Sequence, residues 1–189
     1  TYTTTGQLNT VTDPKGQVKK YGYDDAGRRT AETHYRSATD LTGNLPATTI
    51  IYSYNDLNYP TGYTDGAITT GVTTYDLKQL RKTGETVTHG SGAGQFSLGN
   101  SYTYYTNGQK KSFTGPDGVT VNYTYDANNQ LATVQLPTGN ITVNSYKWSA
   151  PSQITLPGGI VRTQNYDSLM RLTQIQVKSP GQAEFLNYQ

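Results

Sequence analysis

Residues 121–139 read VNYTYDANNQLATVQLPTG, a stretch with two turn signals and two short strand-like runs. The run before the first turn alternates with period two, which puts Tyr123 and Tyr125 on one face of an extended strand. The polar segment that follows and the later Pro-Thr-Gly segment are both rich in turn-forming residues. Tyr and Thr favour strands between such turns. The stretch therefore predicts a strand, a tight turn, a second strand and a second turn.

The same arrangement recurs along the chain at a nearly constant spacing. Successive matching tyrosines are separated by 21, 31, 21, 29, 21, 21, 20 and 22 residues. These anchors are Tyr2, Tyr23, Tyr54, Tyr75, Tyr104, Tyr125, Tyr146, Tyr166 and Tyr188. A fixed period is typical of repeat architectures, and the two long steps indicate insertions near residues 36–48 and 88–99. We expect residues 1–189 to form a single array of about nine units of about 21 residues.

Each unit carries two turn signals at fixed distances from its anchor. Four residues after the anchor stands a residue that tolerates a left-handed backbone in Gly6, Gly27, Asn58, Gly108 and Asn129. Gln79, Ala150 and Met170 do not fit this rule. Twelve residues after the anchor, three Pro-x-Gly turns are expected, at Pro14 to Gly16, Pro116 to Gly118 and Pro137 to Gly139.

Two turns in each unit leave about six residues for each of two strands. Nine units then give about 18 strands, and so wide an antiparallel sheet is expected to curl. The spacing of Leu131 and Val134 breaks strict alternation, which predicts a bulge or a strongly twisted strand in the second half of the unit. The predicted fold class is an all-β, repetitive antiparallel strand-turn-strand sheet, curved or spiralling as an arc or as part of a hollow β shell.

A single unit cannot be stable alone. Ordering its residues costs about 30 kcal/mol at about 1.5 kcal/mol each, whereas burying one Tyr of about 200 Å² returns about 5 kcal/mol. Each unit must therefore pair and pack with its neighbours. We expect the aromatic face to be buried as a ladder of tyrosines, with the hydroxyls bonded to neighbouring Thr, Asn, Gln and Asp side chains.

The two ends of the chain interrupt the period. Tyr2 lacks an incoming strand, and Tyr188 stands where the next turn would begin. We therefore expect the chain to be a fragment of a longer one. Its partners are then further repeats of the same polypeptide, or other copies that pair with the strand edges.

Composition excludes several classes of protein. Only 33% of the residues are apolar and the mean hydropathy is −0.68, yet 17 tyrosines and a charged fraction of 15% argue against disorder. The net charge is +2 with scattered Lys and Arg, so no nucleic-acid partner is indicated. Cysteine is absent, and no apolar run approaches the roughly 20 residues of a membrane span.

No constellation in the sequence indicates a catalytic, cofactor or metal site. His34 and His89 have no partners at metal-ligand or catalytic spacing. The Gly-rich segment 89–99 lacks the Gly-Lys-Ser/Thr of a phosphate loop and is interpreted as an insertion. Asp24, Asp25, Asp117 and Asp126 lack the spacing of a calcium loop and are interpreted as turn formers. We predict a protein that is not an enzyme.

The Tyr-Asp segments resemble the YD repeat, whose pattern is Tyr-Asp, two residues, then Gly-Arg-Leu. They are residues 23–29 (YDDAGRR), 75–77 (YDL), 125–131 (YDANNQL) and 166–172 (YDSLMRL). Residues 13–16 (DPKG) and 115–118 (GPDG) resemble the Pro-x-Gly half of that repeat.

YD repeats mark Rhs proteins, the B and C components of insecticidal Tc toxin complexes, and the teneurins. The resemblance implies a wall of strands that spirals into a hollow shell, which in the bacterial members encloses a toxic C-terminal domain. It implies a structural role, a toxin or effector cargo, and a place outside the cell, either secreted or on the bacterial surface.

Two alternatives stay open. Rows of tyrosines together with Trp148 could stack on sugar rings, which would make the chain a glycan-binding or adhesive array. The interrupted ends could also join copies of the chain into a self-assembled fibre.

Overall fold

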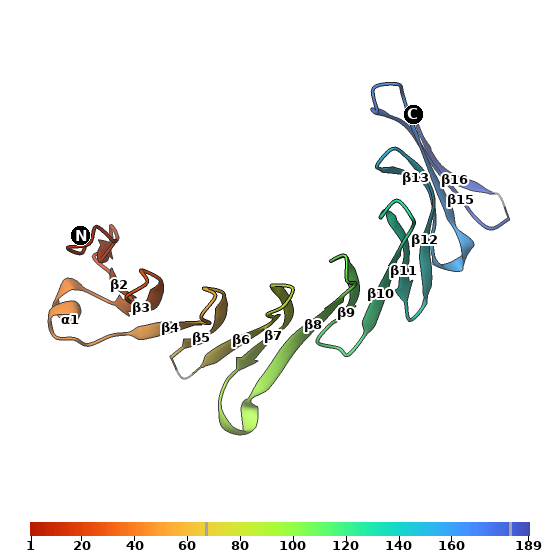
Figure 1. Ribbon diagram of the computed structural model, residues 1–189. Helices are drawn as coiled ribbons and strands as arrows, with labels where there is room; N and C mark the ends of the chain where they lie inside the picture. Colours follow the sequence, from red (N-terminus) through yellow and green to blue (C-terminus); the bar gives the residue numbers. More distant parts are fainter. Residues whose placement is uncertain (67, 182) are drawn as a thin grey trace. The chain divides into compact units, whose positions relative to one another are not determined.

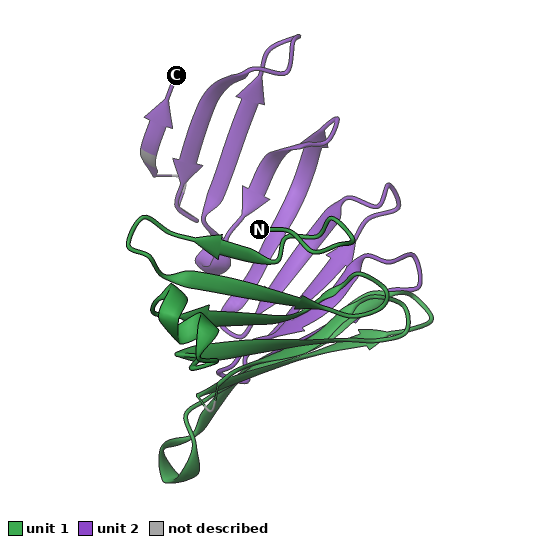
Figure 2. Ribbon diagram, turned by 90° about the vertical axis from the view of Figure 1, so that its left-hand side faces the viewer, with its two compact units in different colours: residues 1–99 green, residues 100–189 purple. Residues whose placement is uncertain are grey.

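The computed structural model describes residues 1–66, 68–181 and 183–189, and these are mostly β-strand. The chain divides into two compact units, residues Thr1–Gly99 and Asn100–Gln189, which Figure 2 colours separately. Within each unit, every strand pairs antiparallel with the strands that precede and follow it in the chain (Figure 1).

Unit 1 consists of seven strands and the beginning of an eighth. They are β1 (Thr10–Thr12), β2 (Val18–Tyr23), β3 (Arg29–Tyr35), β4 (Thr48–Tyr54), β5 (Pro60–Asp65), β6 (Thr69–Asp76), β7 (Arg81–His89) and the first part of β8 (Phe96–Tyr104). The first insertion forms a short helix, α1 (Ala38–Thr42), whose Asp40 main-chain N–H donates to the Ser37 hydroxyl. The second insertion contains one 3-10 turn, η1 (Gly92–Gly94).

Unit 2 continues the same pattern. Residues 101–104 of β8 pair with β9, and the later strands follow in chain order. The strands are β9 (Lys110–Thr114), β10 (Thr120–Tyr125), β11 (Leu131–Leu136), β12 (Gly139–Lys147), β13 (Ala150–Thr155), β14 (Val161–Tyr166), β15 (Leu172–Lys178) and β16 (Glu184–Tyr188). A 3-10 turn, η2 (Pro157–Gly159), joins β13 to β14.

The predicted fold class is confirmed: the chain is an all-β succession of antiparallel strands joined by short turns. The described part has sixteen strands where about 18 were expected. The difference arises at the two ends, because Tyr2 forms only an isolated bridge with Leu8 and the last anchor, Tyr188, ends β16.

The predicted bulge in the second strand is also confirmed. In the pairing of β10 with β11, Thr124 faces Thr133 but Tyr125 faces Leu131, so Ala132 is an extra residue. The same shift follows Tyr23, Tyr54, Tyr104 and Tyr166, seven residues after the anchor in each case. Because one residue is skipped, the residues six and nine after the anchor point to the same face.

The two faces of each sheet differ in chemistry. In unit 2 one face, called here the apolar face of unit 2, carries in register Tyr102, Phe113, Val121, Tyr123, Val134, Ile141, Val143, Ile154, Val177 and Leu186. The opposite face carries cross-strand hydroxyl pairs, of which Thr103–Ser112 and Thr124–Thr133 are each 2.6 Å apart. Unit 1 shows the same division, with Thr33 and Thr49 paired at 3.4 Å.

The expectation that the aromatic face would be fully buried is wrong. Val18, 2% exposed, and Tyr35, 5% exposed, are the buried hydrophobic residues of the described part, and neither is an anchor. The anchors from Tyr23 to Tyr166 are half-buried. Within each unit the strands form a single layer, so a side chain is covered by its neighbours in the sheet and not by a second layer.

Candidate functional site

The hydroxyl groups of the anchor tyrosines link each repeat of about 21 residues to the repeat before it. Tyr146 Oη donates to the main-chain carbonyl of Leu131 at 2.7 Å, and Leu131 stands six residues after the preceding anchor. Equivalent bonds join Tyr23 to Leu8, Tyr54 to Arg29, Tyr75 to Pro60, Tyr125 to Lys110 and Tyr166 to Pro151, at 2.8–3.1 Å. These six hydroxyls thus donate to main-chain carbonyls and not to the expected side chains, although the Tyr166 hydroxyl also accepts from the Gln164 side chain at 3.1 Å. The carbonyl lies beside the bulge, where the strand ladder is interrupted.

The remaining anchors lie in different surroundings. Tyr2 and Tyr188 are 73% and 70% exposed. Tyr2 bridges to Leu8, and Tyr188 faces Ile175 in β15. Tyr104 ends β8 and faces Lys110 across the first turn of unit 2.

Acidic or amide side chains close the turns after the anchors. Asp126 Oδ1 accepts the main-chain N–H groups of Asn128 (2.9 Å) and Gln130 (2.8 Å). Asn129 takes the left-handed φ of 61° between them, as Gly27 and Gly108 do in their turns. This is the turn role expected for the aspartates, in which the side chain mimics a backbone acceptor.

Met170 does not fit the sequence rule for the residue four after the anchor, yet its backbone is left-handed like the others. Met170 has a φ of 62°, although a left-handed conformation costs a side-chain-bearing residue about 1–2 kcal/mol. The turn imposes it, because Asp167 Oδ1 accepts the N–H groups of Leu169 and Arg171 and Met170 N–H donates to the Asp167 carbonyl at 3.2 Å.

The second turn of the unit uses the Pro-x-Gly residues. Gly16 and Gly118 have φ of 80° and 76°, and each donates its N–H to a carbonyl three residues earlier at 3.0 Å. Gly139 has a φ of 134° and faces Leu136 in a two-residue turn. Pro14, Pro116 and Pro137 stand two residues before these glycines, where their fixed φ suits the turn.

A second link joins consecutive turns, and sequence reasoning missed it. Five residues after the anchor, a long polar side chain reaches the turn that follows the next anchor. Gln7 Nε2 donates to the Gly27 carbonyl at 3.1 Å, and Gln130 Nε2 donates to the Trp148 carbonyl at 2.6 Å. Gln109 bonds the Asn129 carbonyl at 2.8 Å. The signal was available, because Gln or Arg recurs at this position in the same 21-residue period.

Arg28 makes the most extensive of these links. Its Nε lies 2.7 Å from Asp24 Oδ2, and its Nη1 donates to the Asn55 carbonyl (3.1 Å) and to Asn58 Oδ1 (2.8 Å) in the next turn. The main-chain N–H of Arg28, followed by its guanidinium, lowers the pKa of Asp24 below its ordinary value. Arg171 lowers the pKa of Asp167 in the same way.

Two cations each lie between a pair of aromatic rings. Each of these rings belongs to the residue two positions before an anchor. Arg29 lies over the rings of Tyr21 (5.6 Å) and Tyr52 (5.1 Å). In unit 2, Lys110 lies over Tyr102 (5.3 Å) and Tyr123 (6.0 Å). Both cations stand six residues after an anchor, where three other repeats have Leu8, Leu131 and Leu172. Each such contact contributes about 0.5–1 kcal/mol at a partly exposed site.

Unit 1 also contains one buried carboxylate. Glu32 is 8% exposed and lies 2.7 Å from His34 Nε2, 3.2 Å from Lys19 Nζ and 3.3 Å from an Arg29 guanidinium nitrogen. Burial alone would raise the pKa of Glu32, but the hydrogen bonds from His34 and Lys19 and the charges of Lys19 and Arg29 hold it below its ordinary value. No sequence pattern indicates that these four residues lie together.

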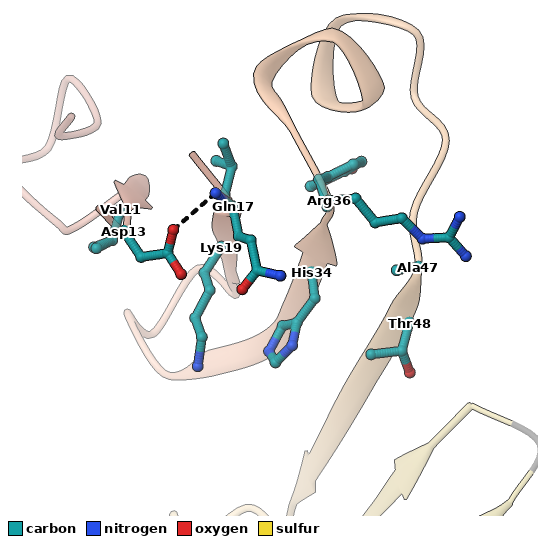
Figure 3. Close-up of a pocket in the computed structure, with 10 residues that line it drawn as sticks. Val11, Asp13, Gln17, Lys19, His34, Arg36, Ala47 and Thr48 are labelled. Atoms are coloured by element: carbon teal, nitrogen blue, oxygen red, sulfur yellow. Dashed lines mark hydrogen bonds between the residues drawn. The ribbon is translucent and has the colours of Figure 1, made fainter. Parts of the chain in front are cut away.

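A cavity of about 270 Å³ lies beside this cluster (Figure 3). Val18 and Tyr35 line it, together with the side chains of Lys19 and His34 and the turn where Asp13 Oδ1 accepts the Gln17 main-chain N–H at 2.8 Å. Its neighbour is the first insertion, where the Tyr35 hydroxyl approaches Asn44 Oδ1 at 3.4 Å. The two buried hydrophobic residues of the described chain, Val18 and Tyr35, thus both line this cavity.

The described residues offer no grouped ligands for a metal ion: no three of their His, Cys, Asp and Glu side chains lie together in a suitable cluster. His89 stacks on Phe96, with ring centroids 5.1 Å apart. Segment 89–99 forms a turn and η1 between β7 and β8. Within the described ranges, no helix has the length and apolar character to cross a membrane.

Two stretches of the chain, residues 2–39 and 101–141, match the family model described as RHS Repeat. Both stretches are similar to RHS repeats. The matched stretches include the Tyr23 and Tyr125 turns, so the resemblance to the YD repeat is confirmed. No curated protein matches the sequence.

Solved structures of Tc toxin complexes have the same fold as these RHS repeats. A crystal structure of a TcdB2-TccC3 complex is 10% identical over 97% of this chain, with a TM-score of 0.75. Another, TcdB2-TccC3-TEV, is 24% identical over 100% of the chain, with a TM-score of 0.59. A Tc holotoxin pore of Photorhabdus luminescens with a mutated TccC3 is 25% identical over 100% of the chain, with a TM-score of 0.59. The chain spans about a tenth of the length of those proteins, 9–10% in each case.

Proposed function

We propose that this chain is a non-enzymatic structural segment in the wall of an Rhs/Tc-type shell that encapsulates a C-terminal toxin or effector domain. The observation that carries the proposal is the repeated bond from an anchor hydroxyl to the preceding repeat, made by Tyr23, Tyr54, Tyr75, Tyr125, Tyr146 and Tyr166. Such contacts between nearest neighbours extend a wall unit by unit. The RHS repeats and the likeness to Tc complexes support the same function.

In this proposal, residues 1–189 act as one repeat array within a secreted or bacterial surface protein. The nine anchors, Gly27, Gly108 and the Pro-x-Gly residues have a structural role. Further repeats of the same polypeptide are the partners of the outer strands, and the toxin or effector is the cargo.

The alternative of a glycan-binding or adhesive array has less support. A sugar platform needs exposed ring faces. The rings of Tyr21, Tyr52, Tyr102 and Tyr123 instead hold the side chains of Arg29 and Lys110. Three exposed rings still favour the alternative: Trp148 (83% exposed), Tyr2 (73%) and Tyr188 (70%). Titration of the Trp148 fluorescence with oligosaccharides tests it.

Limited proteolysis of the parent protein tests the proposed wall. We expect its C-terminal region to resist protease in the native protein and to be cleaved when Tyr125 and Tyr146 are both replaced by Ala, because the wall then opens. The matched control is Tyr188→Phe, which removes a hydroxyl that makes no hydrogen bond within the described part of the chain. A C-terminal region cleaved equally in all three proteins, or a parent protein without a further domain, would contradict the proposal.

A further inference from the structure

The apolar face of unit 2 carries two cations, and no carboxylate of the described residues forms an ion pair with either of them. Lys110 contacts the rings of Tyr102 and Tyr123, and Arg162 stands in register between Ile154 and Val177. Among the described residues, the buried Nε of Arg162 has no hydrogen-bond partner. A buried donor left without a partner costs about 1–3 kcal/mol, more when it is charged.

The side-chain carboxylates of unit 2 all accept hydrogen bonds from groups other than Lys110 and Arg162. Residues 100–189 contain four of them. Asp117, Asp126 and Asp167 accept main-chain N–H groups in their own turns. Glu184 bonds the side chain of Gln176, which faces Thr163 on the hydroxyl face of the sheet. None of the four is therefore placed to neutralise Lys110 or Arg162.

Unit 1 shows how the same position is neutralised within a chain. Arg29, the equivalent of Lys110, lies between two tyrosines and also 3.3 Å from Glu32, nine residues after the anchor. In unit 2 the anchor of the repeat that contains Lys110 is Tyr104, and the residue nine after it is Phe113. The bulge places positions six and nine on one face, so Phe113 stands where a carboxylate would meet Lys110.

We propose that the apolar face of unit 2 binds an extended polypeptide segment with apolar side chains and carboxylates, which Lys110 and Arg162 neutralise. The charge of the face and its lack of carboxylates select an acidic partner. Its row of half-buried apolar side chains selects a polypeptide over a small anion, since such a patch marks an interaction surface. Assigning this segment to the enclosed effector rests on the proposed function, whereas the binding itself does not.

The geometry also predicts the spacing of the carboxylates. Lys110 lies in β9 and Arg162 in β14, five strands apart within unit 2. Five strand spacings are about 24 Å. An extended chain covers that distance in about seven residues, so two carboxylates about seven residues apart fit both cations.

A pair of matched peptides tests the binding to the full 189-residue chain. One fluorescein-labelled 15-residue peptide contains Leu, Ser and two Glu seven residues apart, and its twin has Gln in place of Glu. By fluorescence anisotropy, we expect the Glu peptide to bind about tenfold more tightly than the Gln twin at low salt. The preference should shrink in 0.5 M NaCl, because exposed charges are then screened.

Three variants locate the preference on this face. Arg162→Met and Lys110→Met keep apolar stems, and together they should abolish the preference while the Gln peptide still binds. Phe113→Glu should weaken it by supplying an internal carboxylate to Lys110. Lys178→Met, on the hydroxyl face, should leave it unchanged, and circular dichroism checks that each variant folds.

Equal affinity of the two peptides for the native chain overturns the proposal, as does a preference that survives in the double variant. Both outcomes are distinct from failure of the wall function. That function fails in proteolysis of the parent protein, whatever the peptides do.

Discussion

Replacing Tyr146 by Phe removes one inter-unit hydrogen bond and leaves the ring in place. The lost bond is the one from the Tyr146 hydroxyl to the Leu131 carbonyl at 2.7 Å. Its net contribution is about 1 kcal/mol, and the carbonyl left without a donor adds up to about 1 kcal/mol because the site is only half-buried. We therefore expect the free energy of unfolding to fall by about 1–2 kcal/mol.

The effect should also be local, because repeat units interact mainly with their neighbours. Hydrogen exchange should accelerate about 5- to 30-fold for the amides of β11 and β12, with little change in unit 1. Urea unfolding followed by circular dichroism gives the total loss. The matched control is Tyr188→Phe, whose lost hydroxyl makes no hydrogen bond within the described residues; this variant should cost less than about 0.5 kcal/mol. Equal losses in the two variants, or faster exchange spread evenly over both units, would refute the reasoning.

Three further predictions concern the turns and the tyrosines. Gln130→Ala should cost about 1 kcal/mol in urea unfolding through loss of its bond to the Trp148 carbonyl, and Gln130→Glu, which cannot donate, should not restore it. Gly118→Ala should cost about 1–2 kcal/mol, because its φ is 76° although a Cβ would meet no atom within 4 Å, and Gly118→Asn should cost less. Burial raises the pKa of Tyr125 and Tyr146 above 10.0, so the folded state holds these protons longer and the free energy of unfolding should fall as pH rises above about 10. A double Phe variant should flatten that fall, and an unchanged slope contradicts the assignment.

Much of the fold could be predicted because its determinants are local. The Tyr-Asp turn and the Pro-x-Gly turn each depend on a few adjacent residues, such as Asp126 with Asn129, or Pro116 with Gly118. The skipped residue at Ala132 could be read from the spacing of Leu131 and Val134 alone. Short antiparallel connections then leave little choice of topology, because each strand pairs with the next one along the chain.

The contacts between units could not be predicted in the same way. The choice of acceptor for the Tyr146 hydroxyl depends on the bulge, which exposes a carbonyl on the preceding unit. The turn bond from Gln130 joins residues 18 positions apart and needs the stagger of successive turns. Half-burial of the tyrosines was missed because burial was inferred from periodicity, and periodicity identifies a shared face without showing that another layer covers it.

The residue nine after the anchor decides the electrostatics of each aromatic face. A cation between two rings is attracted by their faces, yet it remains a charge on an otherwise apolar surface. Glu32 neutralises Arg29 inside unit 1, and three donors hold that carboxylate ionised, so this face needs no outside partner. Phe113 extends the apolar surface beside Lys110 and leaves the charge to be met from outside. A repeat array can thus keep one backbone and one set of bonds between repeats. A single position in each repeat then sets whether the charge on its surface is neutralised within the chain or by a bound partner.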